Sequence, residues 1–147
     1  MNCITINTDA SFHPIKKTSG YAFYIICDLF KITKAEQFKT EINNALEAEI
    51  KCIGNALSTL LAQKELPKTK LVVVNTDCQF AISSILRNNK KLNRRVRHII
   101  LLLGHKIGCK VEFRWVKAHS DIKDKRSYAN EWCDKNAKIQ MRANGKK

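Results

Sequence analysis

A short alternating strand that ends in a carboxylate constrains this chain more than any other feature. Ile4 and Ile6 alternate with Thr5 and Asn7, which is the period-two pattern of a β-strand with one face in the core. Asp9 follows, and a carboxylate beside a core strand is costly to desolvate unless a cation compensates its charge. A turn aspartate is the simplest interpretation, but three later carboxylates are predicted to return to the same point.

The length and composition predict one globular domain over residues 1–147. Hydrophobic residues make up 44% of the chain, and its longest apolar run, Ile99 to Leu103, is far shorter than a membrane span. The chain enters its first strand without a signal-peptide pattern. Its six cysteines lack CxxC spacing, which is typical of reduced thiols. We therefore expect a cytoplasmic monomer that needs no membrane.

The charge balance is strongly basic. Lys and Arg number 27 against 13 acidic residues, for a net charge of +14. A compact domain this basic favours a polyanionic partner such as nucleic acid. Charge alone does not distinguish nucleic acid from other polyanions, and a lysine-rich surface also serves solubility.

The periodicity predicts an α/β fold. Strands are expected over residues 4–11, 20–27, 31–39, 70–76 and 111–116. Helices are expected over residues 43–63, 78–86, 91–106 and 127–144, with Asn43 or Asn44 capping the first, Leu86 buried in the second and Ser127 capping the last. Three strands followed by alternating helices and strands predict a mixed sheet that starts antiparallel, with helices packed on its faces.

Asp9 and Asp77 each follow an apolar strand. Neighbouring parallel strands place such residues at the same sheet edge, where open α/β sheets bind ligands. Asp134 lies on a mixed face of the last helix, so we expect one part of that helix to pack and another to meet a polar site.

The first helix offers two competing carboxylates, Glu47 and Glu49. Helical steps from Glu49 reach Cys52, Ile53 and further apolar residues, whereas steps from Glu47 follow a mostly solvated face. Glu49 can therefore point at the sheet edge. The choice between Glu49 and Glu47 stays open at this stage.

Four acids that converge on one point repel one another and need cations. Hard oxygen ligands suit Mg²⁺ or Mn²⁺, and two such ions can promote phosphodiester hydrolysis. A basic protein with an acidic pocket has the charge layout expected of a metal nuclease.

The motifs resemble those of the type 1 ribonuclease H family, in the family's order and over nearly the whole chain. They comprise residues 8–11 (TDAS), 48–49 (AE) with 56–57 (AL), 75–79 (NTDCQ), 115–120 (WVKAHS) and 130–134 (NEWCD) with Ala137. The resemblance implies a ribonuclease H-like fold, with a five-stranded mixed sheet, antiparallel and then parallel, flanked by helices. It also implies Mg²⁺-dependent cleavage of the RNA strand of RNA–DNA hybrids, leaving 3′-hydroxyl and 5′-phosphate ends. Manganese is the expected substitute metal.

Carried over residue by residue, the resemblance identifies Asp9, Glu49, Asp77 and Asp134 as metal-binding carboxylates. It identifies His119 as a loop histidine that assists proton transfer or product departure. The residues expected to contact nucleic acid are Asn44, Lys91, Arg94, Arg97 and Lys117.

The chain also departs from the family pattern. Cys78 stands where Ser is usual and Ala118 where Gly is usual. The pair Asn43 and Asn44 lies two residues further from Glu49 than in the best-known bacterial members, a spacing that favours Glu47. The segment between Asp77 and Trp115 is too short for the basic handle helix of some bacterial members.

Two alternatives stay open. Glu112 follows Asp77 at the separation seen in integrase-like enzymes, although it falls on a strand and not on a helix; the proofreading-type exonucleases are disfavoured because the Asp-x-Glu start is absent. A catalytically silent module that binds hybrid or double-stranded RNA would also explain the charge, although such a module would gain phosphate affinity by losing its acids.

Overall fold

The protein is described by a computed structural model that covers residues 3–117 and 125–144. Its strands are β1 (Ile4–Phe12), β2 (Ser19–Ile26), β3 (Lys31–Glu36), β4 (Leu71–Thr76) and β5 (Lys110–Trp115). Its helices are α1 (Ala45–Leu61), α2 (Gln79–Arg87), α3 (Lys91–Ile107) and α4 (Lys125–Asn144). No helix within these ranges has the length and apolar character that crossing a membrane requires.

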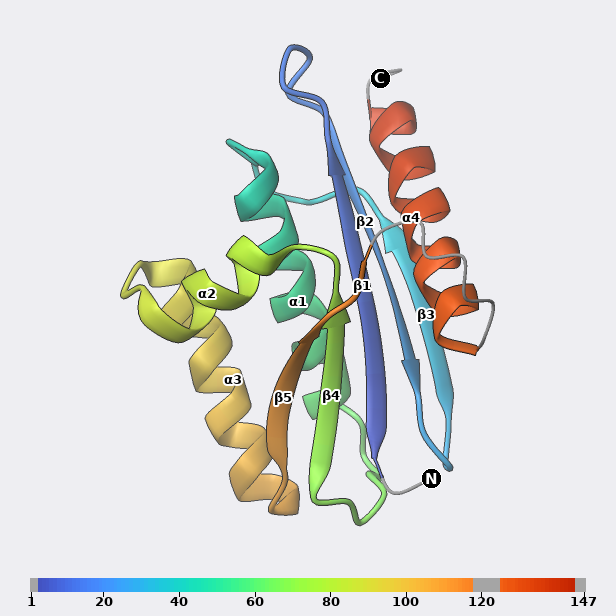
Figure 1. Cartoon of the computed structure of the whole chain (residues 1–147), viewed down its shortest axis with the longest axis vertical. Coiled ribbons are helices and arrows are strands. Elements are labelled where there is room, and N and C mark those ends of the chain that lie inside the picture. Colours follow the sequence, from blue (N-terminus) through green and yellow to red (C-terminus); the bar gives the residue numbers. More distant parts are fainter. Residues whose placement is uncertain (1–2, 118–124, 145–147) are drawn as a thin grey trace.

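The five strands form one mixed sheet in the order β3-β2-β1-β4-β5 (Figure 1). β1 lies at the centre, antiparallel to β2 and parallel to β4. β3 extends the antiparallel half, and β5 extends the parallel half. This arrangement confirms the predicted five-stranded mixed sheet, with the first carboxylate-bearing strand where the two halves meet.

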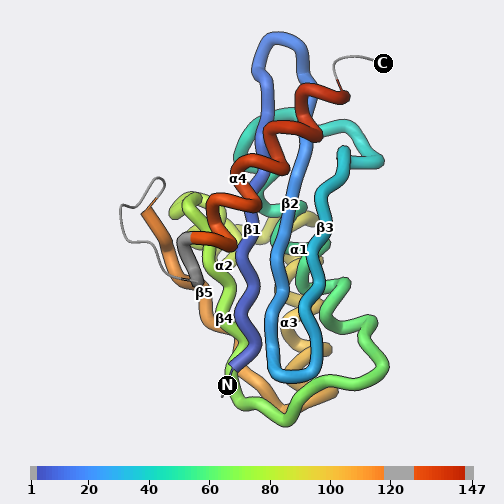
Figure 2. The backbone as a smooth tube through the Cα atoms, turned by 90° about the vertical axis from the view of Figure 1, so that its right-hand side faces the viewer, coloured from blue at the N-terminus to red at the C-terminus, as the bar shows by residue number. Residues whose placement is uncertain are grey.

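Helices cover both faces of the sheet. α1 and α3 lie on one face and α4 crosses the other, which Figure 2 shows from the side of α4. The larger core lies under α1, α2 and α3 and includes Ile4, Ile6, Leu57 and Val74, all fully buried. The expected apolar stripe of α1, from Glu49 through Leu60, is buried throughout.

The opposite face carries a smaller core in which α4 packs closely on β2. Ala22 meets Cys133 and Ala137 of α4 there. Gly20 marks the closest approach, because a Cβ atom at this position would lie 2.6 Å from the carbonyl oxygen of Ala137. Small residues on β2 and α4 therefore determine how closely α4 packs on the sheet. The same packing determines how far Asp134 lies from β1.

Three local predictions were wrong. The third strand ends at Glu36 and does not reach residue 39. α4 begins at Lys125, so Ser127 lies within its first turn and does not precede it as a cap. Leu86 is 59% exposed, because α2 buries only Ala81 and Ile85 against the core.

Candidate active site

The candidate site forms where β1 and β4 part. β1 pairs with β2 as far as Phe12, but it pairs with β4 only as far as Asn7 opposite Asn75. Beyond that pair the edge of β1 that faced β4 is open, and the Ala10 amide lies on it. This amide donates to Asp9 Oδ1 at 2.9 Å and to Glu49 Oε1 at 3.3 Å.

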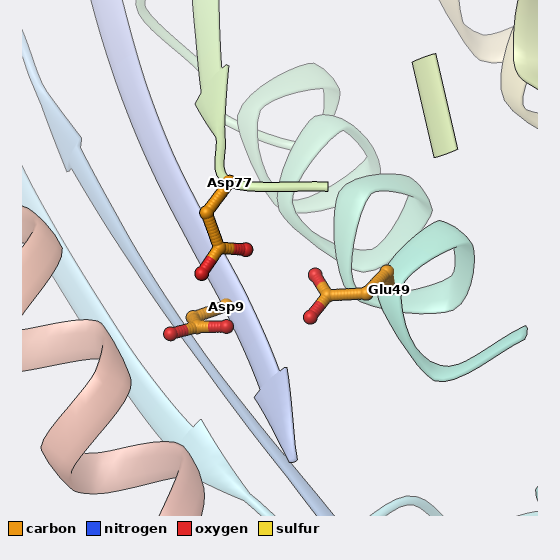
Figure 3. A group of neighbouring side chains, drawn as sticks. All are labelled: Asp9, Glu49 and Asp77. Atoms are coloured by element: carbon orange, nitrogen blue, oxygen red, sulfur yellow. The ribbon is translucent and has the colours of Figure 1, made fainter. Parts of the chain in front are cut away.

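Three carboxylates meet in this opening. Asp9 comes from β1, Glu49 from α1, and Asp77 from the residue after β4 (Figure 3). One oxygen of each lies within 4.8 Å of the others, and Asp9 and Glu49 are buried while Asp77 is half-buried. The structure thus brings together three of the four predicted metal-binding acids.

The geometry favours Glu49 over Glu47. Glu47 completes the N-terminal cap of α1, where its backbone N–H donates to Asn44 Oδ1 at 2.8 Å. Its carboxylate accepts from Asn43 Nδ2 at 3.1 Å and lies 3.6 Å from Lys51 Nζ. The asparagine spacing that favoured Glu47 is therefore the signature of a helix cap.

The electrostatics of the cluster are unfavourable for bare carboxylates. Burial raises the pKa of Asp9 from its ordinary value of 3.8 to about 8, with further contributions from the charges of Asp77 and Asp134. Burial also raises the pKa of Glu49 well above its ordinary value, followed by the charges of Asp9 and Asp77. Within the described part of the chain, no lysine or arginine pairs with Asp9 or Glu49.

These residues fit a hard divalent cation. All the converging ligand atoms are carboxylate oxygens, which are the donors that Mg²⁺ and Mn²⁺ prefer. Glu49 Oε2 is buried without a hydrogen-bond partner, so one ligand oxygen is left for a metal. A cation would also relieve the repulsion between carboxylates that adds to the effect of burial on both pKa values.

Asp134 stands beside this group and not within it. Its charge and a side-chain hydrogen bond contribute to the raised pKa of Asp9, so it approaches Asp9 from α4. Its Oδ2 accepts from Lys138 Nζ at 3.1 Å, one helical turn further along. Asp9 therefore has carboxylate neighbours on both faces of the sheet.

The comparisons with known proteins agree with this arrangement. A family model for RNase H matches residues 1–142. The chain belongs to the RNase H family. The fold resembles the N-terminal RNase H domain of Rv2228c from Mycobacterium tuberculosis, which was solved as a fusion with maltose-binding protein. That match has a TM-score of 0.67 and 14% sequence identity, and it covers 99% of this chain and 98% of the other. No curated protein sequence gives a significant match.

The position of Glu112 decides whether the integrase-like alternative has structural support. This residue lies exposed on β5, away from the three carboxylates, and its Oε2 is 3.4 Å from Arg114 Nη2. The integrase-like alternative required Glu112 in the acidic cluster, so the geometry gives it no support.

The residues predicted to contact nucleic acid fall into different environments. Lys91, Arg94 and Lys117 are exposed. Asn44 is exposed too, and its side chain caps α1. Arg97 is the exception, because its guanidinium donates to the carbonyl oxygens of Ile85 at 2.6 Å and Asn88 at 2.8 Å and to Asn89 Oδ1 at 2.9 Å. In this geometry Arg97 holds the end of α2. His119 lies outside the described residues.

Two groups around the carboxylates had no predicted role. The Cys52 thiol donates to the carbonyl oxygens of Asp9 and Ala22 at 3.4 Å each. Trp115 Nε1 donates to the carbonyl oxygen of Asp77 at 3.2 Å. Both contacts hold the backbone of a candidate ligand. The position of Cys52, one turn after Glu49 on the buried stripe, was the available signal for the first contact.

Proposed function

We propose that this protein is a metal-dependent endoribonuclease that hydrolyses the RNA strand of RNA–DNA hybrids. The observation that carries the proposal is the convergence of Asp9, Glu49 and Asp77 at the open edge of β1, in a chain whose net charge is +14. Without a metal, such an acidic centre in a basic protein is costly. With a metal, it becomes a site at which a phosphate backbone can be bound and cleaved.

Two Mg²⁺ ions, with Mn²⁺ as a substitute, are the proposed cofactors, and Asp9, Glu49, Asp77 and Asp134 are the residues proposed to hold them. Such ions activate a water molecule and stabilise the departing oxygen of a phosphodiester. Asp9 has carboxylate neighbours from α1 and from α4, which supports a shared ligand role for this residue.

In the proposed reaction, an oxygen from water bonds to the phosphorus and the bond from phosphorus to the 3′ oxygen breaks. The RNA therefore ends in a 3′-hydroxyl on one fragment and a 5′-phosphate on the other. The departing 3′ oxygen gains a proton, and His119 is proposed to assist that transfer or the departure of product. His119→Ala should slow turnover by about 10²-fold and leave metal binding intact; loss of metal binding would contradict this role.

The hybrid is proposed to lie across the carboxylate edge and along the exposed start of α3. Lys91 and Arg94 are exposed there, and Lys117 is exposed just after β5. Their charges suit phosphate contacts. Asn44 uses its side-chain oxygen to cap α1, and the side-chain NH₂ group of this exposed residue suits a polar contact with the hybrid. Arg97 was also predicted to bind phosphate, but its three hydrogen bonds to the end of α2 support a role inside the protein.

A cleavage assay over four labelled substrates tests the proposal. These are an RNA–DNA hybrid, double-stranded RNA, duplex DNA and duplex DNA with a single embedded ribonucleotide. The proposal predicts Mg²⁺-dependent cleavage of the hybrid's RNA strand and no cleavage of duplex DNA. Retention of the hybrid without cleavage would instead identify a silent binding module.

A further inference from the structure

We infer that Asn7 and Asn75 form a buried polar floor beneath the carboxylates and hold at least one water molecule that positions Asp9. We call this pair the asparagine floor. The inference rests on the proposed function, because it assigns the floor to the support of a metal-binding carboxylate. Asn7 lies just before the first motif shared with the family, and Asn75 is the first residue of the 75–79 motif; neither was predicted to have a role in the site.

The asparagine floor lies directly behind the site. Asn7 and Asn75 are register partners, and they are the last pair before β1 and β4 part. Side chains alternate along a strand, so Asn7 lies on the same face of β1 as Asp9, two residues further on. Asn75 lies two residues before Asp77, which directly follows β4. The two amides thus lie one step behind Asp9 and Asp77 along their chain segments.

These amides are buried and lack partners. Asn7 is 1% exposed and Asn75 is 0% exposed. Asn7 Oδ1 and both amide atoms of Asn75 have no hydrogen-bond partner. A buried polar group without a partner destabilises the folded state, and in native proteins such groups are satisfied by ordered water when no protein group reaches them.

Half of the unpartnered buried side-chain atoms in the described residues belong to the asparagine floor. In the part of the chain that the structure describes, the buried side-chain atoms without partners are Asn7 Oδ1, Thr8 Oγ1, Glu49 Oε2, Asn75 Nδ2, Asn75 Oδ1 and Asn93 Oδ1. Asn7 Oδ1 and both Asn75 atoms belong to the last register pair before β1 and β4 part. Thr8 lies on the other face of β1, with Ile4 and Ile6. Three unpartnered atoms on one register pair indicate a shared partner behind the carboxylates.

The chemistry of the carboxamide identifies that partner as water. Asn75 presents a donor and an acceptor, and a metal cation cannot bond to an N–H group. A direct bond between Asn7 Oδ1 and Asn75 Nδ2 would satisfy that pair and leave Asn75 Oδ1 alone. Water both donates and accepts. Residues two apart on a strand are separated by roughly 6.6 Å, a gap that one water molecule spans between amide and carboxylate.

A floor of this kind would act on metal affinity. The Ala10 amide holds Asp9 Oδ1 from the open side at 2.9 Å, and the water would hold the carboxylate from behind. Groups that hydrogen-bond to metal ligands fix their orientation, and removing one typically weakens metal affinity about 10–100-fold. Asn7 and Asn75 are therefore positioning residues and make no contact with substrate.

The test measures Mn²⁺ affinity by titration and the melting temperature of the metal-free protein. Asn75→Leu keeps a similar volume and removes both polar atoms, so Mn²⁺ should bind about 10-fold more weakly while the melting temperature holds or rises. Asn75→Ser keeps a donor and an acceptor and should retain most of the affinity. Asn93→Leu is the matched control: Asn93 is 1% exposed and bonds to Ser84 Oγ at 2.9 Å, so its loss should change stability only.

Wild-type affinity in a folded Asn75→Leu variant would overturn the inference. If that variant does not fold, a high-resolution crystal structure of the wild-type protein decides. Density for water within hydrogen-bonding distance of Asn7 and Asn75 supports the inference, and its absence contradicts it. The proposed function fails separately, if the wild-type protein binds no Mn²⁺ and cleaves no hybrid.

Discussion

Replacing Asp9 by Asn should stabilise the metal-free protein in a pH-dependent way. Folding raises the pKa of Asp9 from 3.8 to about 8. Between these values the folded state keeps a proton that the unfolded state has released, so the free energy of unfolding falls as pH rises. The slope for one such group is at most about 1.4 kcal/mol per pH unit, which sets an upper limit of about 5–6 kcal/mol at pH 8.

Water that reaches the carboxylates, and the electrostatic interaction between Asp9 and Glu49, make the actual effect smaller than this upper limit. We therefore expect Asp9→Asn to raise the free energy of unfolding by at least about 1 kcal/mol at pH 7. For a chain of this length, that is a rise in melting temperature of about 3–4 °C. The amide can still accept from the Ala10 N–H, so the local geometry is kept. The gain should vanish near pH 4, where Asp9 is protonated in the wild-type protein.

The assay is thermal unfolding in a chelator from pH 4 to pH 8, with Glu65→Gln as the control. Glu65 is exposed on the loop after α1, so this variant should follow the wild type. Adding Mg²⁺ should raise the melting temperature of the wild-type protein more than that of Asp9→Asn. Parallel pH profiles for wild type and Asp9→Asn would refute the reasoning, because they would show no folding-dependent change in the pKa of this group.

Three further predictions concern other parts of the molecule. Glu49→Gln should abolish most Mg²⁺-dependent turnover while Glu47→Gln leaves the rate nearly unchanged; kinetics showing the reverse would move the ligand to Glu47. Gly20→Ala should lower the free energy of unfolding by about 2 kcal/mol or more, because the new Cβ meets backbone atoms of α4. Gly104→Ala, which meets only an ordinary contact at 3.5 Å, is its control in a denaturant titration, and equal effects would contradict the packing argument. Arg94→Ala should lower the salt slope of hybrid binding by roughly 0.7–0.9, and an unchanged slope would indicate a solvated helix face.

Much of the fold was predictable because its local signals agree with its long-range packing. The alternation from Ile4 to Asn7 marks the central strand. The buried stripe of α1 placed Glu49 toward the sheet, and the structure has it there, 8% exposed. The mixed sheet followed from the order of elements alone.

Two of the errors, at Leu86 and Arg97, come from contacts between residues distant in sequence. Leu86 fits the periodicity of α2, yet too little of the core reaches it. Arg97 looked like a free cation on a helix face, whereas the end of α2 folds back onto its guanidinium. The asparagine floor depends on the register between β1 and β4, and no local pattern encodes that register.

The central claim is that the carboxylate cluster uses a divalent metal to cleave RNA paired with DNA. The most direct test is the initial rate of cleavage of a labelled RNA strand within a hybrid, measured against Mg²⁺ concentration for the wild-type protein and for Asp9→Asn. We predict that the wild-type rate rises from zero with Mg²⁺, that products carry 3′-hydroxyl ends, and that Asp9→Asn stays inactive at every concentration. A wild-type protein that binds the hybrid but shows no Mg²⁺-dependent cleavage, or an Asp9→Asn variant with near-normal turnover, would contradict the claim.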